Sequence, residues 1–236
     1  AMRRLTKGDH TLRLENADQA RLDIRAVPEI AFCYWPTTPV VKALPPRDRA
    51  FAEQYIFPNA NVLLTHNKMT DEEYDMWRAE GRQWVSNSSL PGLDDKEAPT
   101  ADHVYEDWAN NACMTRPGYS GIVVDEFLSS PAGHYAAWSE AVERLYANPG
   151  FDGKTYYAWV VDTYKHEPGL AFMRKLYDLG GRFAWERYIH EEPTDELATL
   201  RMYSSVAVVD DWQKLMPGLM ERLTFCLGSF TTPSCS

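Results

Sequence analysis

GIVVDEFLSSPAGHYAAWSEAVERLYANPGFDGKTYYAWVV (residues 121–161) decides the fold, because it predicts a strand, a helix and a second strand in succession. Its first apolar run, at residues 122–124, is typical of a buried strand. Ser130 and Pro131 then indicate a helix start, since proline is favoured at the first helical position. A turn containing Pro149 and Gly150 leads into the next predicted strand, residues 155–164. The stretch therefore predicts a β–α–β unit.

The same alternation extends to both sides of this unit. Thr70 with Glu73 has the spacing of a capping box, and Gly180 with Gly181 indicates a helix end. The six predicted strands are residues 28–35, 61–67, 82–88, 121–127, 155–164 and 182–190. Strands that alternate with helices over short connections predict a parallel sheet covered by helices.

Two architectures fit this alternation, an open doubly wound sheet and a barrel. No predicted strand leads into a GxGxxG or GxxxxGK[ST] loop, which weakens the nucleotide-binding open sheet. Polar or aromatic residues gather where the predicted strands end, and barrel enzymes build their sites at that rim. These residues are Trp35, His66, Asn67, Asn87, Asp125, Glu126, Asp162, Glu186 and His190. We therefore predict an α/β fold of the (β/α)8 TIM-barrel type, shortened or irregular.

The two ends of the chain depart from the alternation. Residues 1–27 predict a short β-hairpin, an extension or the remnant of an upstream domain, and the barrel is expected over 28–236. Near the carboxyl end we expect a strand at 206–209, a helix from Asp211, and a helix end or strand in LTFCLGSF (223–230). A (β/α)8 barrel usually takes about 250 residues, so 236 residues require a compact version.

Composition excludes several functions. The formal net charge of −10 argues against a nucleic-acid binder, which needs a cationic surface. No apolar run reaches the roughly 18 residues of a membrane span. The four cysteines form no CxxC pair, the six histidines are scattered, and no GxSxG elbow is present. We expect no metal, no cofactor and no membrane span, and the sequence leaves the oligomeric state open.

Two strand ends carry the candidate chemistry. Asp125 and Glu126 follow a buried strand directly, and a buried carboxylate is costly unless it is paired or used. With simple alternation, Glu126 would share a face with Val124, and Asp125 would lie on the opposite face. Glu186 ends the aromatic strand FAWERY (183–188). Each carboxylate could instead cap a helix or pair with an arginine.

On the strands GIVVDEF (121–127) and RFAWERY (182–188), the chain resembles the (β/α)8-barrel glycoside hydrolases. The resemblance implies that Glu126 is the acid/base and Glu186 the nucleophile. Those enzymes most often place the nucleophile on the seventh strand, whereas Glu186 is on the sixth predicted one, so Asp125 or Asp162 could be the partner instead. Carbohydrate is the implied substrate.

Aromatic side chains with polar edges suit the faces of sugar rings, and this chain has eight Trp and 13 Tyr. The expected substrate-binding residues are Tyr34, Trp35, His66, Asn67, Asn87, Trp159, Asp162, Trp185 and Tyr188. Since neighbours on a strand face opposite ways, about half of these rings should belong to the core. The rival hypothesis is a barrel that binds carbohydrate without catalysis.

Overall fold

A computed structural model describes residues 9–13, 15, 22–23, 29–34, 49–65, 70–117, 119–187 and 192–226. Most of the predicted amino-terminal hairpin lies outside these residues. Within them, one sheet contains seven strands in the sequential order β1 to β7, and every neighbouring pair is parallel. The strands are β1 (Ala31–Tyr34), β2 (Val62–Thr65), β3 (Gln83–Ser88), β4 (Gly121–Phe127), β5 (Thr155–Val160), β6 (Arg182–Glu186) and β7 (Leu223–Cys226).

The prediction of a closed (β/α)8 barrel is wrong, because the sheet curls into an incomplete barrel. In the part of the chain that the structure describes, no pairing joins β7 back to β1, and no eighth strand follows. The α/β class and the parallel sheet are confirmed.

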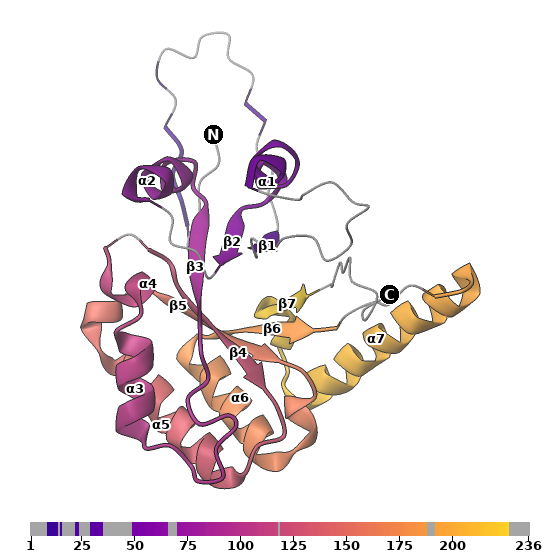
Figure 1. The fold of residues 1–236 in the computed structure, drawn as a ribbon. Coiled ribbons are helices and arrows are strands. Elements are labelled where there is room, and N and C mark those ends of the chain that lie inside the picture. The colour runs from indigo at the N-terminus through magenta and orange to yellow at the C-terminus, as the bar shows by residue number, and fades with distance from the viewer. Residues whose placement is uncertain are drawn as a thin grey trace.

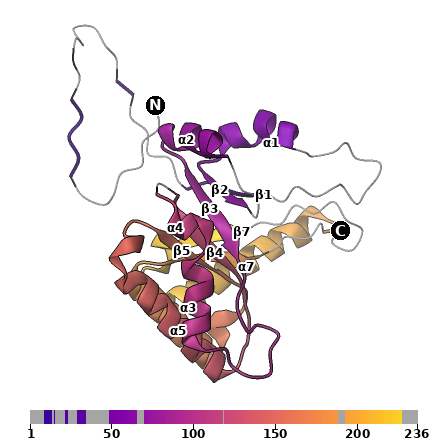
Figure 2. The same ribbon diagram turned by 60° about the vertical axis from the view of Figure 1, so that its left-hand side comes forward.

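The helices follow the strands as the alternation predicts. Figure 1 shows α3, α5 and α6 gathered on one side of β4 and β5, while α7 extends away from them. The view in Figure 2 shows α1 and α2 beside the first strands. The helices are α1 (Arg49–Tyr55), α2 (Asp71–Ala79), α3 (Ala101–Ala109), α4 (Ala112–Thr115), α5 (Ala132–Ala147), α6 (Glu167–Leu179) and α7 (Asp195–Leu215). None of the described helices is long and apolar enough to cross a bilayer.

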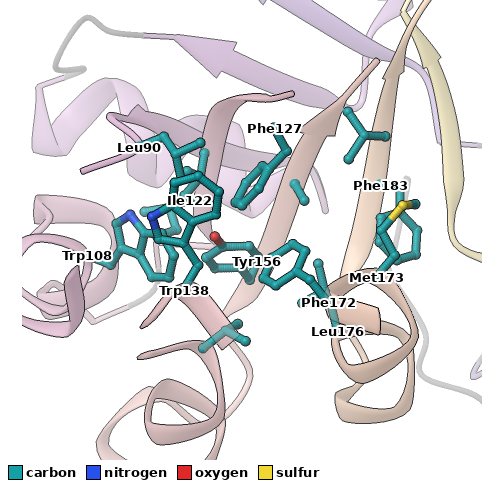
Figure 3. Close-up of a cluster of buried hydrophobic side chains, with 14 of the residues drawn as sticks. Leu90, Trp108, Ile122, Phe127, Trp138, Tyr156, Phe172, Met173, Leu176 and Phe183 are labelled. Atoms are coloured by element: carbon teal, nitrogen blue, oxygen red, sulfur yellow. The ribbon is translucent and has the colours of Figure 1, made fainter. Parts of the chain in front are cut away.

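The main hydrophobic core lies between the sheet and these helices. Ile122 and Phe127 of β4 pack there with Trp138 of α5 and Phe172 of α6. Figure 3 shows these aromatic and aliphatic side chains interleaved between strand and helix. Aromatic rings bury large apolar areas, so the many aromatic residues serve this core first.

A second, smaller cluster fills the concave face of the sheet. It consists of Val62, Leu64, Val85, Val123, Tyr157, Trp159 and Ala184, with Ala31 and Cys226 packed against it. Because the cluster joins residues of β1 and β7, the two edge strands curl toward each other around it.

Glu29, just before β1, reinforces this curl. Its carboxylate accepts a 2.7 Å hydrogen bond from the Tyr157 hydroxyl of β5 and one of 3.4 Å from Thr224 of β7. It also lies 3.3 Å from the guanidinium of Arg182 on β6. One carboxylate therefore links the start of β1 to three strands on the far side of the sheet.

The observed helix ends can be compared with the helix-end signals predicted from the sequence. Thr70 and Glu73 form the predicted capping box of α2, and Gly180 ends α6 in the left-handed conformation. The predicted start of the next helix, with Ser130 as its cap and Pro131 as its first residue, is wrong by one residue. The helix α5 begins at Ala132 with Pro131 at the N-cap, and no side chain caps it.

The predicted strand at 206–209 is also wrong, because these residues lie within α7. Ser205, Val209, Trp212 and Met216 are buried at the spacing of one helix face. That helical period overrides the β-preference of the valines. The stretch LTFCLGSF begins with β7, which confirms the strand alternative for residues 223–226.

Candidate active site

A bulge in β4 sets the geometry of the Asp125–Glu126 pair. Val124 is in register with Ala158 of β5, and Phe127 is in register with Val160. Two residues of β4 therefore lie between these pairs, where β5 has only one. Glu126 has φ of 60°, the one positive φ among the described residues other than glycine. A bulge with a left-handed residue re-aims the side chains beside it. The strained backbone conformation therefore lies at Glu126, within the pair of carboxylates.

The bulge breaks the simple alternation on which the sequence argument relied. Val124 and Phe127 both contact the helix-covered core, and Val123 belongs to the concave cluster. Asp125 follows Val123 at the two-residue period of the strand, which places it on the concave face, and it is half-buried. Glu126 is the extra residue of the bulge and is exposed.

Two buried side chains and one half-buried histidine hold the backbone that follows the pair. The Thr163 hydroxyl donates to the carbonyl of Phe127, and the Tyr135 hydroxyl donates to that of Leu128. His166 Nε2 lies 2.9 Å from the carbonyl oxygen of Ser130. Three side chains from the following elements thus anchor the β4–α5 loop. The sequence contains no motif that would have singled them out.

Glu186 lies at the carboxyl end of β6, on the concave face that Ala184 shares. The indole Nε1 of Trp159 on β5 donates a 2.7 Å hydrogen bond to Glu186 Oε2. Trp159 itself belongs to the concave cluster. The structure therefore brings Glu186 and Trp159, two of the predicted site residues, into direct contact.

Asp125 lies close enough to the other two carboxylates for its pKa to respond to them. Burial raises the pKa of Asp125 from 3.8 to about 6, with further increases from the charges of Glu126 and Glu186. Desolvation and like charges both disfavour the ionised form of a carboxyl group. Asp125 is therefore a carboxyl group that keeps its proton up to about pH 6.

Among the other predicted site residues that the structure describes, Trp185 and Asp162 have their contacts away from this cluster. Trp185 faces the helix-covered core beside Trp212 and is 2% exposed, so it belongs to the core. Asp162 is exposed and pairs with Lys165 at 2.7 Å. Asn87 is half-buried on β3, one strand away from Asp125. Tyr34 is in β1, but its side chain lies outside the described residues, as do Trp35, His66, Asn67, Tyr188 and His190.

A polar hollow of about 510 Å³ lies elsewhere, between the end of β3 and one face of α3. Ser89, His103, Asp107 and Asn111 are among its lining residues, and none of the three carboxylates is. The side chains of Ser89 and Asp107 already bond each other at 3.2 Å. Within the described ranges, no group of three His, Cys, Asp or Glu side chains could hold a metal ion.

No protein-family model matches the chain, and no curated protein matches it. The assignment of function therefore depends on the geometry and electrostatics of this site.

Proposed function

We propose that this protein hydrolyses glycosidic bonds, with Asp125 as the general acid and Glu186 as its ionised partner. The observation that carries the proposal is the raised pKa of Asp125, about 6, beside two further carboxylates. Glycoside hydrolysis requires one carboxyl group that keeps its proton and another that is charged. This assignment gives Asp125 the acid role that the resemblance to glycoside hydrolases implied for Glu126.

In the proposed reaction, Asp125 donates its proton to the bridging oxygen of the glycosidic bond as the bond from that oxygen to the anomeric carbon breaks. The carboxylate of Glu186 faces the positive charge that develops at the anomeric carbon. It either attacks that carbon, as in retaining enzymes, or removes a proton from the attacking water, as in inverting enzymes. Glu126 acts on Asp125, since its negative charge helps to raise the pKa of that group.

The test is release of reducing ends from a panel of soluble polysaccharides and aryl glycosides. We expect wild type to cleave at least one of them, and Asp125→Asn to lower kcat about 100-fold or more while binding persists, because loss of a general acid typically costs 10²–10⁴. Asp152→Asn removes an exposed carboxylate from the turn before β5, and it should match wild type. If wild type binds glycans but cleaves none of them, the chain is a non-catalytic carbohydrate-binding module and the proposal fails.

A further inference from the structure

We propose that Trp159 is a positioning residue that holds the Glu186 carboxylate in its working orientation, rather than a platform on which a sugar ring stacks. The inference rests on the proposed function, in which Glu186 is the ionised partner of Asp125. It assigns Trp159 a role that differs from the sugar-binding role expected from the sequence.

The burial of Trp159 argues against stacking. The residue is only 7% exposed, and its ring packs in the concave cluster with Val123 and Ala184. A ring that stacks on sugar must present an open face to solvent. Trp159 instead uses its polar edge, since its Nε1–H group is bonded to Glu186 Oε2 at 2.7 Å.

The register of β5 and β6 explains why the indole reaches Glu186. Trp159 is directly in register with Ala184, and Glu186 is two residues further along the same face of β6. Residues directly opposite on neighbouring strands have side chains within contact distance, and a diagonal neighbour is within reach of an aromatic side chain. The small side chain of Ala184 leaves room for the indole to extend toward Glu186.

A hydrogen bond to a carboxylate has directional as well as energetic effects. A donor to an ionised group forms a shorter and stronger bond than one to a neutral group. Productive catalysis requires the reacting group to be held close to its working geometry. A rigid indole that is buried in the concave cluster is suited to that task, because its packed neighbours restrict its movement.

The same strand shows this arrangement a second time. Tyr157, two residues before Trp159 on the concave face, donates from its hydroxyl to Glu29 at 2.7 Å. Each of these two concave aromatic residues of β5 thus holds one carboxylate. Tyr157 holds Glu29, just before β1, and Trp159 holds Glu186, at the end of β6. The Glu29 contact fixes the curl of the sheet, whereas the Glu186 contact is at the candidate active site.

The first test compares Trp159→Phe with Trp84→Phe. Both remove an indole N–H from a buried residue of the sheet, but Trp84 Nε1 has no hydrogen-bond partner among the described residues. We expect Trp159→Phe to lower kcat about 10- to 100-fold with KM within about twofold, and Trp84→Phe to leave both unchanged. An increase in KM with kcat preserved would show that Trp159 binds substrate, and would overturn the inference.

A second test needs no turnover. The indole N–H resonance of Trp159 is the one that Trp159→Phe removes from the ¹H–¹⁵N spectrum. In Glu186→Ala that resonance should move to higher field, because the carboxylate acceptor is lost, while the Trp84 resonance stays in place. A Trp159 resonance that does not move overturns the inference. If it moves but wild type cleaves no glycoside, the contact stands as a structural one and the proposed function fails.

Discussion

At the scale of single residues, the three carboxylates differ in their surroundings although they lie together. Asp125 is half-buried and bears the raised pKa, Glu126 is exposed, and Glu186 is bonded to an indole. Environment, rather than residue type, separates their roles. This separation leads to two predictions about pH.

The first concerns activity. Because Asp125 must be protonated to act as the acid, kcat/KM should fall as pH rises through about 6. Glu126→Gln removes one of the two charges that raise this pKa, so the high-pH limb should move to lower pH. Glu140→Gln removes an exposed charge from α5 and should leave the profile unchanged. Coincident profiles for Glu126→Gln and wild type would contradict the electrostatic coupling.

The second concerns stability. The pKa of Asp125 is raised on folding, from 3.8 to about 6, so the folded protein binds a proton more tightly than the unfolded chain does. The contribution of Asp125 is therefore most favourable below pH 4 and is lost as pH rises through 6. Asp125→Asn mimics the neutral acid, so it should raise Tm at pH 8 and leave Tm close to wild type at pH 4. A lower Tm for Asp125→Asn at pH 8 would contradict the assignment.

At the scale of elements, the bulge in β4 is the feature that joins fold to site. It places a left-handed residue, Glu126, beside the half-buried Asp125, and the following loop is held by Thr163, Tyr135 and His166. Non-glycine residues in sparsely populated backbone conformations cluster at functional sites, where surrounding contacts maintain them.

The bulge allows the backbone strain to be measured apart from the charge. Glu126→Ala and Glu126→Gly both remove the carboxylate, but only glycine adopts φ of 60° without a steric penalty. Glu126→Gly should be about 1 kcal/mol more stable than Glu126→Ala in urea unfolding, since a left-handed residue costs roughly 1–2 kcal/mol. Equal stabilities would show that position 126 is not strained.

At the scale of the whole molecule, Glu29 replaces some of the closure that an eighth strand would provide. Its carboxylate contacts side chains of β5, β6 and β7 from the start of β1. Removing it leaves the Tyr157 hydroxyl and the Arg182 guanidinium without this partner.

We expect Glu29→Ala to lower the free energy of unfolding by about 1–3 kcal/mol, because it removes two hydrogen bonds and an ion pair to a largely buried carboxylate. Glu29→Gln keeps an acceptor for Tyr157 and should lose less. Chemical denaturation of the three proteins measures both differences. A Glu29→Ala variant as stable as wild type would mean that the curl of the sheet does not depend on this contact.

The sequence predicts the parts of this fold that depend on local pattern. The six strands up to Glu186, the capping box at Thr70 and the glycine cap at Gly180 all follow from periodicity and helix-end signals. Whether the sheet closes into a barrel depends on contacts between strands that are distant in the sequence, and no local sequence pattern indicates such contacts. Likewise the bulge at Glu126 appears only in the pairing of β4 with β5, so alternation could not show that Glu126 is an exposed extra residue instead of continuing the face of Val124.

The measurement that tests the central claim most directly compares wild type and Asp125→Asn on aryl glycosides with poor and good leaving groups. A general acid matters most when the leaving oxygen is strongly basic. If Asp125 is that acid, Asp125→Asn should lose far more activity on a glycoside with a basic leaving group, such as an alkyl alcohol, than on a dinitrophenyl glycoside. Equal losses on both substrates would contradict the assignment of Asp125 as the proton donor.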